Sequence, residues 1–194
     1  WVDPPYAISP KQGLENKISN SQIKYAKGCD IKSSNTSGFE EAINLAKTSD
    51  YVIFVGGLDQ TQEGENYEPG PVDRTGGSIE LPAKQQELIS ELAKVNPNVI
   101  VVIKSGGICA VPQAIDDIKG FLYAFYPGME GGNAIADVIY GDYNPSAKLP
   151  VTMPVNDAQM PEWNDDFSDD YNGGYRYYDE LGITPQYAFG YGLS

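Results

Sequence analysis

The sequence predicts an α/β fold, with a mainly parallel sheet sandwiched by helices and an irregular C-terminal tail. Two observations support this. Short β-branched or aromatic runs alternate with longer amphipathic stretches along the chain. Each short run is apolar throughout, as expected of a strand covered on both faces. Three such strand–helix units imply parallel strands with helices on both faces of the sheet.

The first predicted pair is a helix over residues 39–47 followed by a strand over residues 51–55. The helix places its apolar side chains on one broad face, and Ser37 precedes it as a predicted N-cap. The strand ends at Gly56-Gly57, after which a polar loop begins. Loops that follow strand carboxyl ends are where parallel sheets bind ligands.

The next helix is expected to start at Pro82, since an apolar stripe follows it: Leu88, Ile89, Leu92 and Ala93. A second buried strand covers residues 99–103 and leads into Ser105-Gly106-Gly107. A helical segment is then predicted over about residues 111–118. The order of these elements repeats the first unit.

The third strand is predicted over residues 121–126, and a helix over residues 129–140 ends at Gly141 as its C-cap. From Pro145 onward, regular periodicity disappears. Strands are predicted there only at residues 148–152 and 175–178. We expect this tail to wrap the sandwich, so that residues 1–194 form one α/β sandwich domain.

Composition excludes several classes of function. The chain has 194 residues, 41% hydrophobic content and a formal net charge of -14. Such a charge repels phosphate backbones and anionic lipid surfaces, so we expect no nucleic acid or membrane partner. The apolar runs are too short to span a bilayer, which predicts a soluble protein. The start at Trp1, followed by Pro4-Pro5, leads us to expect a fragment of a longer chain.

The inventory of reactive side chains narrows the chemistry further. There is no histidine, which removes Ser-His-Asp and Cys-His catalysis and argues against zinc. The glycine pairs do not match a dinucleotide fingerprint or a P-loop. The two cysteines, Cys29 and Cys109, are too few for a disulfide framework, and spacing leaves open whether they pair or stay free thiols.

Carboxylates concentrate in the loop after the first predicted strand: Asp59, Glu63, Glu65, Glu68 and Asp73. A carboxyl group there could act as a general acid if a neighbour such as Tyr67 raises its pKa. The same loop could instead be a solvated connector, or a weak calcium site built from Asp59, Glu63 and Glu65. Spacing alone leaves these three interpretations open.

Several segments resemble the second domain of glycoside hydrolase family 3 β-glucosidases and β-xylosidases. They are YPGMEGGNAIADV at residues 126–138, GDYNPSAKLP at 141–150 and PQYAFGYGLS at 185–194. Pro4-Pro5-Tyr6 and Gly13-Leu14 resemble the early part of the same domain. The resemblance therefore runs almost from end to end, and it implies the α/β sandwich fold.

The resemblance also implies a retaining mechanism shared between two domains. In this family an N-terminal (β/α) barrel supplies an Asp nucleophile, and the sandwich domain supplies a general acid/base Glu. Gly64-Glu65-Asn66-Tyr67, followed by Asp73-Arg74, is similar to the family's acid/base segment. The acid/base role then falls on Glu65, Tyr67 flanks the aglycone side of the substrate, and Asp73-Arg74 resembles a structural ion pair.

The chain also departs from the family pattern. Asn66 stands where the family usually has glycine, and Glu63 is a second acidic candidate for the acid/base role. The barrel, the first sandwich strand and the fibronectin-like domain have no counterpart in the sequence. The expected function is therefore one part of a β-glucosidase that removes terminal β-D-glucosyl residues, inactive without the barrel domain.

The implied partners are a β-linked oligosaccharide or aryl glucoside and the barrel domain, with no metal or organic cofactor. Members of this family commonly act on extracellular sugars, and Asn35-Thr36-Ser37 matches the N-glycosylation sequon. Together these two observations predict a secreted protein. Two alternatives are kept: a non-catalytic carbohydrate-binding or assembly module with the same fold, and a flavodoxin-like small-molecule binder.

Overall fold

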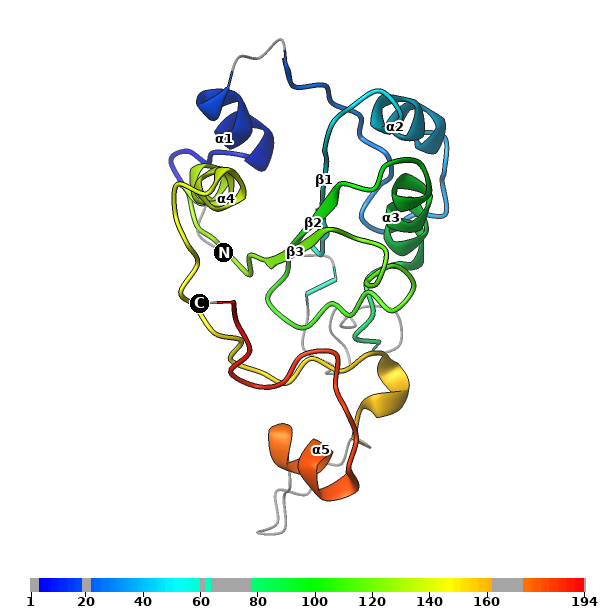
Figure 1. The fold of residues 1–194 in the computed structure, drawn as a ribbon, viewed down its shortest axis with the longest axis vertical. Coiled ribbons are helices and arrows are strands. Elements are labelled where there is room, and N and C mark those ends of the chain that lie inside the picture. The colour runs from blue at the N-terminus through cyan, green and yellow to red at the C-terminus, as the bar shows by residue number, and fades with distance from the viewer. Residues whose placement is uncertain (1–3, 19–21, 60–61, 64–77, 162–172, 194) are drawn as a thin grey trace. The chain divides into compact units, whose positions relative to one another are not determined.

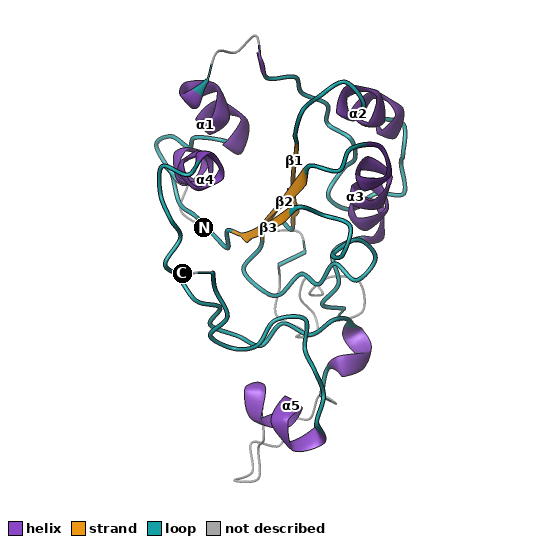
Figure 2. Ribbon diagram, viewed as in Figure 1, coloured by secondary structure: helices purple, strands orange, loops and turns teal. Residues whose placement is uncertain are grey.

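Three parallel strands form the centre of the first of two compact units, Trp1–Tyr143 and Asn144–Ser194. The computed structural model describes residues 4–18, 22–59, 62–63, 78–161 and 173–193. The strands β1 (Val52–Gly57), β2 (Val99–Lys104) and β3 (Gly120–Tyr123) lie in the order β1-β2-β3. Figure 2 shows them in orange between the helices. The predicted α/β class with a parallel sheet flanked by helices is confirmed.

The register of the sheet brings the carboxyl ends of the strands together. Val52 pairs with Val99 at one end of β1, and Gly57 pairs with Lys104 at the other. Ile103 of β2 pairs with Tyr123 of β3. Val99, Val101, Val102 and Ile103 are all 0% exposed, as predicted for a strand covered on both faces.

One face of the sheet is covered by α2 (Phe39–Ala46) and α3 (Ala83–Val95), which lie together in Figure 1. The apolar stripe of α3 is buried in the core with the strand side chains: Leu88, Ile89 and Leu92 are at most 3% exposed. Burying a side chain of this size stabilises the fold by about 1.5–3 kcal/mol. The predicted helix start at Pro82 is confirmed, since Pro82 is the N-cap.

On the other side lie α1 (Pro10–Lys17) and α4 (Gly131–Tyr140), packed against each other (Figure 1). A Cβ added to Gly13 would lie 2.0 Å from the carbonyl oxygen of Gly132, and one added to Gly132 would lie 2.1 Å from that of Ser9. Only glycine allows backbones to approach so closely. The predicted C-cap is confirmed, because Gly141 is left-handed with φ 79°.

Helix α1 was not predicted from periodicity. Its apolar content is low, and it starts instead with a capping box. Ser9 caps the helix by accepting a hydrogen bond from the backbone of Gln12, whose side chain bonds back to the backbone of Ser9. Ser9-Pro10 with Gln12 was the signal in the sequence.

Three local predictions in this unit were wrong. Ser37 does not cap α2, because the N-cap is Gly38 and no side chain caps it. Residues 111–118 form consecutive turns rather than a regular helix, since the chain must return at once to the sheet, where Lys119 donates to the carbonyl of Val99 at 2.7 Å. β3 ends at Tyr123 because Phe125 has φ 48°, which ends the extended backbone.

The second unit is mostly irregular, with η2 (Asp157–Gln159) and α5 (Tyr175–Leu181). Residues 175–178 are helical rather than the predicted strand, and left-handed Gly182 ends that helix. Residues 148–152 are not a strand either, although Met153 forms an isolated antiparallel bridge with Tyr187. The wrapping of the sandwich by this tail stays a prediction.

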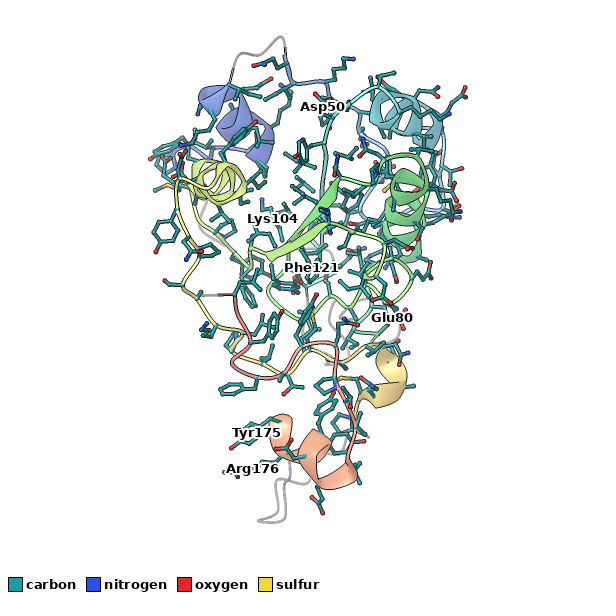
Figure 3. All side chains as sticks on the ribbon, in the orientation of Figure 1. Asp50, Glu80, Lys104, Phe121, Tyr175 and Arg176 are labelled. Atoms are coloured by element: carbon teal, nitrogen blue, oxygen red, sulfur yellow. The ribbon has the colours of Figure 1, made fainter. Side chains whose placement is uncertain are left out.

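Aromatic side chains organise the second unit where regular structure is sparse. The rings of Tyr175 and Phe189 lie 5.6 Å apart, and those of Tyr187 and Tyr191 lie 4.8 Å apart. Arg176 places its guanidinium 5.8 Å from the ring centre of Tyr175, which Figure 3 labels beside it. Among the described residues, no helix is both long and apolar enough to cross a membrane.

Candidate functional site

A cavity of about 450 Å³ opens at the carboxyl ends of β1 and β2. Its walls come from β1 and the residues after it, from the end of β2, from the segment that follows β3 and from the segment before α2: Ile31, Val55, Gly56, Gly57, Leu58, Asp59, Lys104 and Tyr126. Lys104 is labelled on β2 in Figure 3. Parallel sheets place ligands at this edge, so the position matches the expected site.

Gln85 of α3 fixes the backbone at the end of β1. Its side chain is 2% exposed, accepts a hydrogen bond from the N–H of Gly57 at 2.9 Å and donates to the carbonyl of the same residue at 2.8 Å. A second donation, at 3.0 Å, reaches the carbonyl of Ile31. The floor of the cavity is therefore held by a buried and fully hydrogen-bonded amide.

Glycine is required at this edge for steric reasons. Gly57 has φ 134°, and a Cβ there would lie 1.9 Å from the carbonyl oxygen of Lys104. A Cβ on Gly56 would lie 2.4 Å from Oε1 of Gln85. The Gly56-Gly57 pair thus serves close packing, and Gly57 also supplies a positive φ that side chains other than glycine rarely adopt.

Beyond the glycine pair, backbone hydrogen bonds join Gln62 and Glu63 to Asp59. The backbone N–H groups of Gln62 and Glu63 donate to the carbonyl of Asp59 at 2.9 and 3.0 Å. The side chain of Gln62 is 2% exposed and points into the protein. The carboxyl group of Glu63 lies at the edge of the sheet, beside Gly106.

The Glu63 side chain is bonded to the residues that follow β2. Its Oε1 accepts a hydrogen bond from the N–H of Gly106 at 2.7 Å and lies 2.8 Å from Oγ of Ser105. Ser105 is completely buried, and its hydroxyl is also 2.8 Å from the carbonyl of Gly107. The hydroxyl of Tyr123 donates to that same carbonyl. One network therefore links Glu63 to the residues that follow β2 and to the end of β3.

Tyr126 contributes an exposed aromatic ring beside this network. Its side chain is 64% exposed, and a Cβ on Gly106 would lie 2.5 Å from the ring. The preceding residue, Phe125, has a left-handed backbone, and its ring packs 4.7 Å from that of Tyr123. Strained non-glycine residues persist where the surrounding structure fixes them, and they cluster at functional sites.

The sequence-predicted site residues fall into two groups. Glu65 and Tyr67 lie outside the described residues, as do Glu68 and Asp73-Arg74. The structure brings Asp59 and Glu63 to the expected edge of the sheet. Within the described ranges, no group of three or more His, Cys, Asp or Glu side chains could bind a metal. The calcium site considered above also needs Glu65, which lies outside those ranges.

The sequence analysis did not identify the residues that hold the backbone of the site in place or lie beside it. Gln85, Ser105 and Tyr126 were not predicted as site residues, although Ser105 stands two residues after the second predicted strand and Tyr126 is the last residue of the third. That position was the available signal for both. For Gln85 there was no signal, because a glutamine on a helix is usually solvated.

The two cysteines are free thiols, and burial raises the pKa of Cys29.

Residues 1–194 match the family model for the glycosyl hydrolase family 3 C-terminal domain. A curated relative is a β-xylosidase from Formosa agariphila, 37% identical over 195 residues. The match covers 98% of this chain and 26% of the relative, so the chain spans about a quarter of that protein's length.

Solved structures agree in fold. A family 3 β-glucosidase from Bifidobacterium adolescentis superposes with a TM-score of 0.83 at 31% identity, covering 100% of this chain and 29% of that one. A family 3 exo-β-xylosidase, XlnD, bound to a xylobiose aziridine activity-based probe, gives a TM-score of 0.80 at 33% identity. That match covers 98% of this chain and 24% of the other.

Proposed function

The chain belongs to glycosyl hydrolase family 3 as a C-terminal domain, and on that premise we propose that it supplies the general acid/base carboxyl of a retaining β-glycosidase. The observation that supports the proposal most is the position of Glu63. Its carboxyl group contacts Ser105 and Gly106 just after β2, and Glu63 precedes Glu65 by two residues in the sequence. Residues 1–194 are proposed to act as one sandwich domain of a longer enzyme.

Glu65 is the proposed acid/base, and Tyr67 the proposed contact to the aglycone. Glu65 first protonates the departing glycosidic oxygen while an Asp of the barrel domain attacks the anomeric carbon. The resulting Glu65 carboxylate then takes a proton from water, whose oxygen displaces the barrel Asp from the same carbon. The two inversions give retained configuration.

This mechanism needs both domains. The two carboxyl groups of a retaining glycosidase stand about 5 Å apart on opposite faces of the sugar. The nucleophile is proposed to come from the barrel domain, so the chain alone is expected to be inactive. The required partner is the barrel domain, and the substrate is a β-linked oligosaccharide or aryl glycoside.

The proposed sugar is a terminal non-reducing β-D-glucosyl residue. The similarity to the Bifidobacterium β-glucosidase supports glucose, whereas the Formosa relative favours xylose. Assays of the complete enzyme on a panel of aryl β-glycosides distinguish the two sugars. A higher kcat/KM for the glucoside supports the proposal, whereas a higher kcat/KM for the xyloside would show that the preferred sugar is xylose. The reaction class is common to both.

We also propose that the protein is secreted. The sequon at Asn35 supports this, because Asn35 is exposed in the loop before α2. Mass spectrometry of material from a eukaryotic host would show a glycan on Asn35 if the segment passes through the secretory route. An unmodified Asn35 from such a host would argue against it.

The proposal is tested by purifying the native protein, mapping its peptides and assaying Glu65→Gln. Barrel peptides in the purified protein, and a variant that loses activity on poor leaving groups but keeps more on activated aryl glycosides, support the enzyme. Removing a general acid costs about 10²–10⁴-fold. If only this chain is found, the non-catalytic binding or assembly module replaces the enzyme as the function.

A further inference from the structure

We propose that Glu63 is a positioning residue, whose carboxylate holds the chain just before Glu65 to the first residues after β2. This inference rests on the proposed function, because it explains how the Glu65 carboxyl is delivered to the substrate. It gives Glu63, the other acidic candidate in this loop, a role distinct from proton transfer.

The contacts of Glu63 join segments that are far apart in the sequence. Its Oε1 receives the N–H of Gly106 at 2.7 Å, across 43 positions of the chain, and lies 2.8 Å from the Ser105 hydroxyl. Hydrogen bonds to a charged acceptor are about twice as strong as neutral ones. The contact therefore joins Glu63 to Ser105 and Gly106, of which Ser105 is completely buried.

Glu63 is also fixed through its own backbone. Its N–H donates to the carbonyl of Asp59 at 3.0 Å, and its neighbour Gln62 is 2% exposed. Ser105 is completely buried, so its hydroxyl has a fixed position against which the Glu63 carboxylate packs. Both ends of the Glu63 side chain are therefore held, two residues before Glu65.

This arrangement fits an anchor better than a proton donor. A general acid must place a carboxyl oxygen within hydrogen-bond reach of the glycosidic oxygen. Oε1 of Glu63 instead accepts the N–H of Gly106 and lies 2.8 Å from the Ser105 hydroxyl, and these contacts hold the carboxylate toward the sheet. An anchor of this kind acts through geometry, and a misplacement of about 1 Å in an active site can cost about 100-fold in rate.

The test compares Glu63→Gln, Glu63→Ala and Glu65→Gln in the complete enzyme, with Glu91→Gln as a matched surface control. Glutamine keeps an acceptor oxygen but cannot donate a carboxyl proton. We expect Glu63→Gln to retain activity within about 3-fold, since its amide oxygen accepts the same two bonds. Glu63→Ala should lower kcat about 10–100-fold with little change in KM, because the acid/base is misplaced.

Hydrogen–deuterium exchange of the complete enzyme gives a readout independent of turnover. The amide of Gly106 should exchange faster in Glu63→Ala than in the wild type, Glu63→Gln or Glu91→Gln. Faster exchange together with the conservative rescue supports the inference.

Two results overturn the inference. If Glu63→Gln is as damaged as Glu65→Gln is expected to be, Glu63 transfers the proton itself. If Glu63→Ala changes neither kcat nor the exchange of Gly106, the contact positions nothing. Failure of the proposed function is a different result, since Glu65→Gln would then keep full activity on poor leaving groups whatever the Glu63 variants do.

Discussion

The two helical layers of the first unit are held by different physical means. The layer of α2 and α3 is held by apolar burial, with Ile89 of α3 at 0% exposure in the core. The pair of α1 and α4 is held by close backbone approach at Gly13 and Gly132, and polar contacts such as the Lys17–Asp137 ion pair lie at its exposed rim. Apolar layers tolerate small shifts, whereas a glycine contact tolerates almost none.

The difference also decides what sequence reasoning can find. The helices α2, α3 and α4 each carry an apolar stripe, and all three were predicted with small errors at their ends. Helix α1 buries only Gly13 and Leu14 and was missed. Hydrophobic periodicity in the sequence detects helices that bury apolar side chains. A helix held by close backbone contact buries few of them, so periodicity does not detect it.

The site shows the same limit. The carboxyl ends of β1 and β2 were predictable to within two residues, because β-branched runs and glycine pairs mark them. The bond between Glu63 and Gly106 was not, since it joins positions 43 apart that only the tertiary fold brings together. The left-handed Phe125, which shortens β3, was equally hidden, because phenylalanine rarely adopts that backbone.

The largest effect should come from the apolar layer. Ile89→Ala removes a completely buried side chain of α3, and we expect a loss of about 2–5 kcal/mol in unfolding free energy from lost transfer and the cavity left behind. Hydrogen exchange of the β2 amides measures this loss. A loss below 1 kcal/mol would mean that apolar packing on α3 is not what holds this layer.

A second substitution tests the glycine contact. Gly132→Ala places a Cβ 2.1 Å from the carbonyl oxygen of Ser9, which must move because it is backbone. Overpacking of this kind costs about 1–3 kcal/mol. Exchange should accelerate in α1 and α4 and stay unchanged in α3, and equal acceleration in both layers would contradict the separation drawn here.

A third, smaller effect is expected at the start of α1. Ser9→Ala removes the N-cap hydroxyl, and with it a bond to the backbone of Gln12. The expected cost is about 1 kcal/mol, and Ser9→Asp should restore most of it because aspartate is an equally good cap. Local exchange of the α1 amides is the measurement. If both variants match the wild type, the capping box does not hold α1.

The smallest effect is expected at the rim. Hydrogen bonds to Asp137 and Asp142 raise the pKa of Lys17, so its contribution to stability is present below the unfolded pKa and is lost as pH rises through the folded one. The residue is exposed and screened by water. Lys17→Met should leave the thermal midpoint unchanged at pH 7, and a clear drop there would show that the ion pairs hold α1.

The most direct test of the proposed catalytic role is azide rescue of Glu65→Gln in the complete enzyme. Azide needs no general base, so it can displace the barrel Asp from the glycosyl-enzyme when the acid/base is missing. We predict that azide restores turnover of an activated aryl β-glucoside and yields the β-glycosyl azide. No rescue, or an α-glycosyl azide, would contradict the assignment of the acid/base to Glu65.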